Sequence, residues 1–491
     1  MGRAVPLQSN WSRGMKRDMA RSDLPPGTAW NLVDYIPDLD APLTKRGGWS
    51  YGSNDISLVK ATASYVVAGI YAPFAAASKN CAIDEDGEFY TIASSLAVTD
   101  VGLSNASVPK APLAFHRDRV IITRGNGTTA PGSYDGTTLG ALAGTPPAAI
   151  YGAVYKDRTA LANTVAQPNR TYFSGAGSPV TWDTVNSWID MSFPVSGLAS
   201  LRNALIVFSN QRVERIRGAT PPPGSDMVLE TLFEPGCIDA RSIVFFEDNV
   251  VFASTKGLYI TDGAAVSDLT ERGGMLRYWR DLFSAYAAAT WTVTGGKHRG
   301  WYVLSVMDGP TFKDAFMIDI PHNVWLRLSN VKAVMMWDAV GTAPETYYGS
   351  RAQPRVNSLS SLFSPAAGVK NDADGIAVVP VLETTWFKPA QGKLTWRNLY
   401  TTYDCQDAAA DNPVLTVSFV ETPEDTTYTN ITDFTGAANT LAETTLYTRA
   451  RRRLSFPAHG LGFKIAQTNA SSVTKLWALE VDAHPREPSR V

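Results

Sequence analysis

The sequence predicts an all-β protein, with a β-propeller of six to seven blades followed by a C-terminal antiparallel β-sandwich platform domain. Three observations lead to this fold class. A short hairpin pattern recurs about every 40–45 residues, which is the period of a four-stranded propeller blade. The last quarter of the chain instead alternates apolar and polar residues. Finally, Thr, Ser, Gly, Pro and aromatic residues are plentiful and only 18% of residues are charged, a mixture that favours strands and turns.

The repeated unit is a hairpin in which a basic or acidic residue is followed by Asp or Asn at the turn. These side chains bond nearby backbone and tolerate left-handed angles. Four copies align without gaps: AFHRDRVIIT (114–123), AVYKDRTALA (153–162), ASLRNALIVF (199–208) and VFFEDNVVFA (244–253). Each is followed by another strand that ends in a Gly-bearing turn. A row of independent β-sandwich domains is the alternative, but such domains do not usually repeat one hairpin at this interval.

The pattern divides the chain into four parts. We expect an extended N-terminal arm (1–28), a propeller with lead-in strands (29–365), a polar Gly/Asp linker (366–375) and the platform domain (376–491).

The arm carries more basic than acidic residues, and the sequence LPPG at 24–27 prevents a helix from continuing through it. Because it has too few apolar residues for a core of its own, we expect it to be ordered only against a neighbouring subunit. The candidate intersubunit contacts are Arg3, Arg13, Lys16, Arg17 and Arg21.

One segment inserted in the propeller, about 273–288, has helical periodicity. Leu276, Trp279, Phe283 and Tyr286 form a single amphipathic stripe. We expect a helix that caps the core or lies at an interface, because a short stripe flanked by arginines is weak evidence for lipid contact.

The sequence gives no sign of catalytic chemistry. Its five His have no metal-ligand spacing, and no phosphate-binding loop or nucleophile elbow occurs. Cys81, Cys237 and Cys405 lie far apart, as expected for inert thiols. We therefore predict no catalytic, cofactor-binding or metal-binding residues and no cofactor. The repeated Asp box of sialidase blades is also missing. A pair of carboxylates placed for glycosidase chemistry elsewhere in the chain stays an open alternative.

One charge cluster stands out against a net charge of −2. It comprises Arg449, Arg451, Arg452 and Arg453. On a strand, the first, second and fourth of these would share a face, which suits either phosphate groups or an acidic neighbouring subunit.

The chain resembles the β-propeller tail nozzle, or hub, proteins of short-tailed bacteriophages. Related sequence patterns occur in minor tail proteins of long-tailed phages. The resemblance runs from about residue 24 to the end and is one of pattern. It lies in residues 31–53, 196–218, 234–263 and 480–491, where Gly236, Cys237, Ser242, Val244, Gly257, Tyr259, Asp262 and Gly263 match the family's spacing.

The resemblance implies a non-enzymatic structural component of the virion, assembled in the host cytoplasm. About six copies would form a ring around the genome-ejection channel and contact other tail or adaptor proteins. Genomic double-stranded DNA would pass through the lumen without specific binding, and no stable membrane insertion is expected. The alternatives are a receptor-binding or polysaccharide-degrading propeller tail protein, and a minor tail or baseplate protein of a long-tailed phage.

Overall fold

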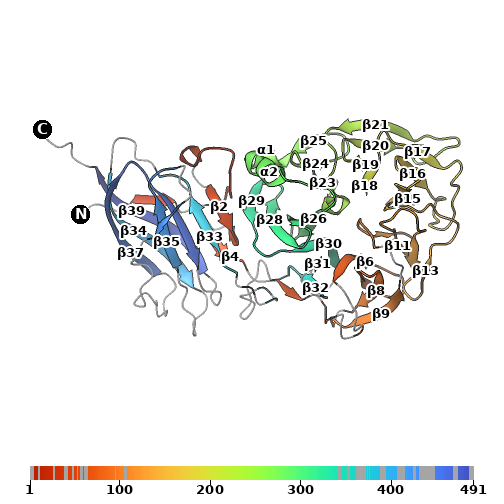
Figure 1. The fold of residues 1–491 in the computed structure, drawn as a ribbon, viewed down its shortest axis with the longest axis horizontal. Coiled ribbons are helices and arrows are strands. Elements are labelled where there is room, and N and C mark those ends of the chain that lie inside the picture. The colour runs from red at the N-terminus through yellow and green to blue at the C-terminus, as the bar shows by residue number, and fades with distance from the viewer. Residues whose placement is uncertain are drawn as a thin grey trace.

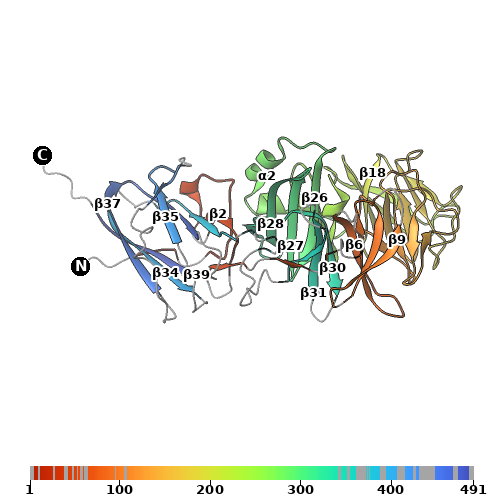
Figure 2. The same ribbon diagram turned by 60° about the horizontal axis from the view of Figure 1, so that its bottom comes forward.

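The structure is a computed structural model, and it describes most of the 491 residues. The described residues are 5–8, 11–25, 28–37, 43–46, 49–51, 53–55, 59, 65–93, 95–103, 108–340, 344–350, 354–360, 372, 374, 376, 378–387, 394–405, 415–423, 427–430, 448–467 and 474–485. The fold is all-β, as predicted, with a propeller and a platform lying end to end (Figures 1 and 2).

In the described chain, seven four-stranded antiparallel units surround the propeller axis. Six are separate sheets, and the seventh, β26–β29, belongs to a larger sheet. The prediction of six to seven blades is therefore confirmed. The first four units contain β6 (Val66–Ala72), β7 (Lys79–Asp84), β8 (Glu88–Ile92), β9 (Val98–Leu103); β10 (Ala114–Phe115), β11 (Val120–Ile122), β12 (Gly132–Tyr134), β13 (Leu139–Ala141); β14 (Tyr151–Tyr155), β15 (Arg158–Ala162), β16 (Arg170–Phe173), β17 (Trp188–Asp190); β18 (Val195–Ser200), β19 (Leu205–Ser209), β20 (Val213–Arg217) and β21 (Val228–Phe233).

The last unit is completed by a strand from the other end of the domain. After β30 to β32, its fourth strand is β5, which precedes all the other blades, with Asn357 paired to Tyr51. The N-terminal side of the domain thus closes the ring. The remaining strands are β22 (Val244–Phe246), β23 (Asn249–Ala253), β24 (Leu258–Thr261), β25 (Val266–Asp268); β26 (Trp291–His298), β27 (Trp301–Asp308), β28 (Thr311–Asp319), β29 (Val324–Arg327); β30 (Ala333–Val340), β31 (Pro344–Ser350), β32 (Val356–Ser358) and β5 (Ser50–Tyr51).

The repeated sequence pattern corresponds to the inner hairpin of four consecutive blades. The copies fall on β10–β11, β14–β15, β18–β19 and β22–β23. Two of the turns have both central residues at positive φ, with Arg117 at 48° and Asp118 at 61°, and Lys156 at 47° and Asp157 at 58°. This geometry matches the right-handed twist of the strands that it joins.

The platform contains two sheets that pack face to face. One has the order β3-β4-β39-β34-β37, with β1 also paired to β39; the other continues from β29 through β2-β33-β38-β35-β36. Val417 and Leu479, from the two sheets, are fully buried between them. The strands are β1 (Val5–Gln8), β2 (Ala29–Val33), β3 (Tyr35–Pro37), β4 (Leu43–Lys45), β33 (Val381–Thr384), β34 (Leu394–Cys405), β35 (Leu415–Val420), β36 (Thr429–Asn430), β37 (Thr448–Ala458), β38 (Gly462–Gln467) and β39 (Thr474–Pro485).

The N-terminal segment is part of the platform, which corrects the predicted domain boundaries. β1 pairs with β39, β2 with β33 and β4 with β39. Trp11 and Met15 are 0% and 1% exposed within the same core cluster as the platform strands. The expected arm ordered only against a neighbouring subunit is therefore corrected for the described residues. The strands β2 to β4, expected to lead into the propeller, belong to the platform, whereas β5 does belong to the propeller. Two large apolar side chains and backbone strand pairing hold this segment on the platform. A count of its charges did not reveal these contacts.

A nine-stranded sheet joins the two domains. β2 of the platform lies parallel to β29 of the propeller, with Val33 opposite Arg327. One hydrophobic cluster extends from Leu479 in the platform to Val303 in the propeller. Blade and platform therefore share a sheet and a core.

The predicted helix at about 273–288 is shorter than expected. The helix within this range is α2 (Leu276–Phe283), and a separate short helix, α1 (Leu269–Arg272), precedes it. Trp279 and Phe283 are buried, and Trp279 packs edge-on against Trp325 of β29 with ring centroids 6.3 Å apart. The stripe therefore caps the core, which confirms one of the two roles that we expected.

Candidate functional site

The propeller axis contains a pocket of about 550 Å³, lined by the innermost strands of all seven blades. Such a volume lies within the range of small-molecule sites. We refer to it as the axial pocket. Its wall includes β6, the segment that leads into β10, β14, β18, the short 3-10 turn Ala240–Ser242 with β22, β26 and β30.

Small residues set the width of the axial pocket. A Cβ on Gly69 would lie 2.4 Å from the Trp337 ring, and one on Gly296 would lie 2.8 Å from Cβ of Met336. The two large side chains therefore pack over bare backbone of the neighbouring blades. Without these glycines the inner strands would have to shift apart.

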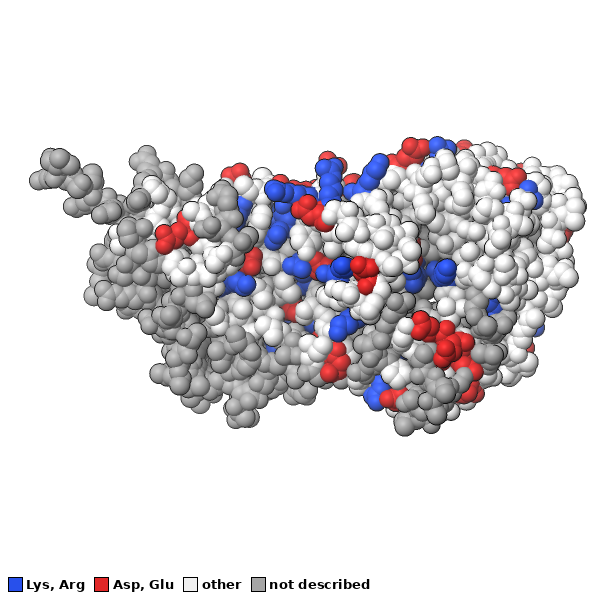
Figure 3. Space-filling view, in the orientation of Figure 1, with Lys and Arg blue, Asp and Glu red and all other residues white. Residues whose placement is uncertain are grey.

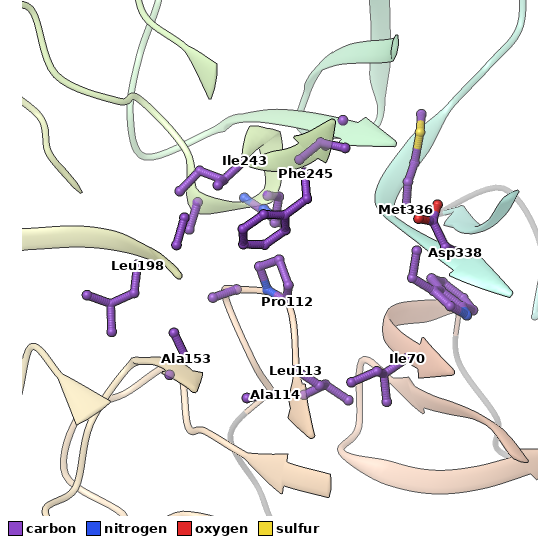
Figure 4. Close-up of a pocket in the computed structure, with 18 of the residues that line it drawn as sticks. Ile70, Pro112, Leu113, Ala114, Ala153, Leu198, Ile243, Phe245, Met336 and Asp338 are labelled. Carbon is purple, nitrogen blue, oxygen red and sulfur yellow. The ribbon is translucent and has the colours of Figure 1, made fainter. Parts of the chain in front are cut away.

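One side of the axial pocket is apolar. Figure 4 shows Phe245, Ile243, Pro112 and Leu198 on this side, with Met336 and Asp338 across the opening. Phe245 is 47% exposed, although most aromatic side chains of this size are buried in the protein. An exposed ring inside a concave surface is typical of a contact site for an apolar ligand group.

Among the described residues, three charged side chains line the axial pocket, and one of them already has an ion-pair partner. Arg241 forms an ion pair with Asp239, with Nη2 2.8 Å from Oδ2. Asp239 also accepts from the backbone N–H of Arg241 and of Val293. This pair fixes the turn that begins at residue 240 and holds it against β26.

The other two charges are Lys297 of β26 and Asp338 of β30, from adjacent blades. Lys297 Nζ lies 5.0 Å from the ring centroid of Phe246. Among the described residues, neither side chain has an ion-pair partner. The Asp338 carboxylate is exposed to the channel, yet the surrounding walls raise its pKa to about 6, with Lys297 opposing the shift.

The predicted intersubunit residues mostly make contacts within the chain. Arg21 is 3% exposed, and its guanidinium donates to the carbonyl of Thr384 (2.7 Å), the hydroxyl of Tyr428 (2.8 Å) and the carbonyl of Phe463 (3.2 Å). It therefore anchors the N-terminal segment to the platform. For this residue the expected role in ordering an arm against a neighbour is corrected.

Arg17 lies between two aromatic rings, 4.4 Å from the centroid of Trp30 and 5.3 Å from that of Tyr278. Burial lowers its pKa. Lys16 packs beside Gly274, and Arg13 is exposed. Arg3 lies outside the described residues. Contact between these four and another subunit stays a prediction.

The arginine cluster lies on a strand, β37, as expected. Arg451 is opposite Tyr400 and Arg452 opposite Leu399 of β34. In the described strand order β37 is at the edge of its sheet. The side chains of Arg449, Arg451, Arg452 and Arg453 lie outside the described residues, so their partners stay a prediction.

A buried ion network stabilises the junction between the domains. Arg46 is fully buried, with Nε 2.6 Å from Asp34 and Nη1 2.8 Å from Asp372. Its Nη2 donates to the carbonyl of Ser329, in the loop between β29 and β30. Burial lowers the pKa of Arg46, but the two carboxylates outweigh burial and raise it. Asp372 was assigned to a polar Gly/Asp linker, and it is 2% exposed in the structure.

Two histidines connect neighbouring blades through the same type of bond. His116 Nδ1 lies 2.7 Å from Thr159 Oγ1, and His298 Nδ1 lies 3.2 Å from Thr346 Oγ1. Each His precedes an inner hairpin turn, and each Thr belongs to the second strand of the next blade. Because both threonines are about 1% exposed or less, the arrangement suits blade packing and not attack on a substrate.

Two of the cysteines are buried, as expected for inert thiols. Cys81 and Cys237 are buried free thiols whose pKa values burial raises to about 12. Within the described part of the chain, no group of three or more His, Cys, Asp or Glu side chains is placed to hold a metal ion. No described helix is long and apolar enough to cross a membrane.

The face shown in Figure 3 carries charges of both signs over the two helices. The two helices carry exposed Arg272, Arg277 and Arg280 together with exposed Glu271 and Asp281. Interspersed charges of this kind are weaker attractors of a polyanion than a single-sign stripe.

Sequence reasoning missed the axial pocket. Phe245, Lys297 and Asp338 lie on inner strands of three blades, and nothing in their spacing shows that they converge. The available signal was the hairpin repeat itself, since the first strand of each copy lines the axis.

Comparisons with known proteins show similarity of fold. No protein-family model and no curated protein matches the chain. Among solved structures it is similar to BamB from Moraxella catarrhalis, with 13% identity, 72% of this chain and 97% of that chain covered, and a TM-score of 0.38. The WD40 domain of Neurospora crassa Pan2 has 8% identity, with 66% and 96% covered and a TM-score of 0.40. At these scores the similarities carry no argument about function.

Proposed function

We propose that the protein is a structural subunit of a bacteriophage tail and forms a ring, with six copies as the expected number, around the genome-ejection channel. The proposal begins from the sequence resemblance to tail nozzle proteins. Its segments at 31–53 and 480–491 include platform strands and β5, which closes the propeller.

The observation that best supports this proposal is the rigid connection between the two domains. A channel wall has to keep its shape while DNA is driven past it, so its domains should not move independently. Here a nine-stranded sheet crosses from propeller to platform. Buried Arg46 also pairs with Asp34 of the platform and with Asp372, and it donates to the carbonyl of Ser329 in the propeller. Domains joined only by a linker would usually move relative to each other.

The protein is proposed to have no enzymatic activity. A glycosidase, the enzymatic alternative, needs two carboxyl groups on either side of the scissile bond. Among the described residues that line the axial pocket, Asp338 is the one carboxylate. This favours the structural reading over a polysaccharide-degrading one. The alternative role, as a minor tail protein of a long-tailed phage, would also require a ring with rigid walls.

In this proposal the genome passes through the ring without being gripped. Each phosphate bound by Lys or Arg would add salt-dependent affinity and resist movement of the duplex. We therefore expect Arg449, Arg451, Arg452 and Arg453 to contact neighbouring subunits. A binding assay with duplex DNA at about 150 mM salt tests this point, and micromolar affinity that is lost on changing Arg451 to Ser would contradict it.

Two measurements test the ring itself. Light scattering and negative-stain electron microscopy of the purified full chain should show a closed oligomer with a central opening. Antibodies raised against the chain should label the tails of phage particles from its source. A protein that stays monomeric at high concentration and is absent from tails would rule the proposal out.

A further inference from the structure

We propose that the axial pocket binds a small zwitterion with apolar side chains, such as a short apolar peptide with free termini. Its ammonium group would pair with Asp338, its carboxylate with Lys297, and its side chains would pack on Phe245 and the surrounding apolar wall. This inference is independent of the role in a phage tail.

The charges carry the first step. Lys297 and Asp338 come from adjacent inner strands and line the same pocket, and neither has an ion-pair partner among the described residues. A carboxylate with walls around it and no cation in contact is in an unfavourable state, which its raised pKa reflects. A ligand that carries both signs would satisfy both groups at once, while an ion of one sign would satisfy only one.

The third charge in the pocket does not compete for this ligand. Arg241 is already paired with Asp239, and that pair also bonds the backbone of β26 through Val293. The charges left for a ligand are therefore one positive and one negative. Their separation exceeds ion-pair contact but still permits an electrostatic effect of Lys297 on Asp338.

The apolar wall carries the second step. Phe245 is 47% exposed in a pocket that also presents Leu198, Ile243 and Pro112 (Figure 4). A hydrophilic zwitterion would leave this surface wet, whereas an apolar side chain would cover it. At about 550 Å³ the pocket has room for more than one amino-acid residue, and an extended dipeptide spans roughly 7 Å.

The experiment is calorimetric titration of the full chain with leucyl-phenylalanine, its N-acetyl form and its C-terminal amide. The variants are Asp338→Asn and Lys297→Met, with exposed Lys256→Met as the matched control. Circular dichroism and thermal melting would establish that each variant is folded. Phe245→Ala provides a second, uncharged change in the wall.

We expect the unmodified dipeptide to bind and to lose about tenfold or more in affinity with either charge variant. The acetylated peptide should bind weakly and be insensitive to Asp338→Asn, and the amide should be insensitive to Lys297→Met. Phe245→Ala should weaken all three ligands, and Lys256→Met none. Absence of binding at about 10 mM peptide, or equal weakening of all three ligands by both charge variants, would overturn the proposal.

Discussion

The propeller and the platform solve the same problem, the pairing of β-strands, over very different distances along the chain. A blade such as β14–β17 is formed within residues 151–190, with each strand paired to the next one in sequence. In the platform, β1 at Val5–Gln8 pairs with β39 at Thr474–Pro485. Local pairing closes short loops, whereas pairing between the two ends of a chain has to wait until the whole chain is present.

This difference indicates where the protein is sensitive to change. A blade depends on its own hairpins and its two neighbours. The platform depends on an N-terminal segment that supplies strands, core side chains and buried charges. We therefore expect deletions and core substitutions to lower the stability of the platform more than that of the propeller.

The largest effect should come from removing residues 1–24. This deletion removes β1, buried Trp11 and Met15, and the three hydrogen bonds of Arg21 to the platform. A single buried Trp or Met is worth about 2–5 kcal/mol, so the platform should lose most of its stability. Limited proteolysis should then cut within 376–491 and spare the blades.

Deletion of residues 1–4, which lie before β1, is the control for that truncation. If the longer deletion resisted proteolysis as well as the full chain does, the N-terminal segment would not be an integral part of the platform. The contrast between the domains would then be wrong.

A somewhat smaller effect is expected from Arg46→Met at the junction. The substitution leaves the buried carboxylates of Asp34 and Asp372 without their cation, which typically costs about 3–5 kcal/mol. Lys313→Met, which breaks a partly exposed pair with Asp308, should cost about 1 kcal/mol or less. Chemical denaturation measures both, and equal losses would show that burial of the network is unimportant.

Acidification should destabilise the propeller through His298. Burial, with a smaller effect of Arg299, lowers the pKa of this histidine to about 4. Because the folded state excludes a proton that the unfolded chain takes up, stability is complete above about pH 6.5 and is lost as the pH falls toward 4. At pH 5 the loss is about 2 kcal/mol.

The His298→Gln variant should lack this pH dependence, although it is less stable at pH 7. His116→Gln is the matched change at the equivalent position of another blade, where Asp157 contacts the ring. Denaturation curves between pH 5 and 7 make the comparison. A His298→Gln protein that still loses the full amount on acidification would show that another group is responsible.

The smallest effect is expected at the axial pocket, and it has the opposite sign. The surroundings of Asp338 raise its pKa from 3.8 to about 6, so ionisation of this carboxylate disfavours folding. The penalty is fully present above about pH 6 and is lost as the pH falls from 6 toward 4. Asp338→Asn should therefore stabilise the protein at pH 7, by about 1 kcal/mol or less because the carboxylate is exposed to the channel. At pH 5 about half of the gain should remain, and it should be gone below about pH 4. Destabilisation at pH 7 would contradict the assignment.

The sequence predicts the propeller better than the platform because the propeller strands pair locally, whereas the platform strands pair across the length of the chain. The Arg117–Asp118 and Lys156–Asp157 turns are visible as local residue types, and the structure has them at positive φ. The pairing of β2 with β33 has no local signature, since the partners are hundreds of residues apart. Charge counting assigned Arg21 to an intersubunit contact because its aromatic and carbonyl partners come from the far end of the chain.

The axial pocket lies between these cases. The inner strands were predicted, but which of their side chains face each other depends on how the blades are rotated around the axis. Lys297 and Asp338 are separated along the chain by β27, β28 and β29, yet they line the same pocket from neighbouring blades. No spacing rule in a single sequence identifies such a pair.

The closure of the propeller by β5 also has a mechanical consequence. The chain enters the ring at Ser50–Tyr51 and leaves it at Val356–Ser358, and these two strands are hydrogen-bonded neighbours. Tension applied to the two termini would therefore cross the propeller along one strand pair and leave the other blades unloaded. The same force would act on β1 and β39 at the end of the pair where Val5 lies opposite Val481. Because the two strands are antiparallel, their hydrogen bonds would break in sequence from that end.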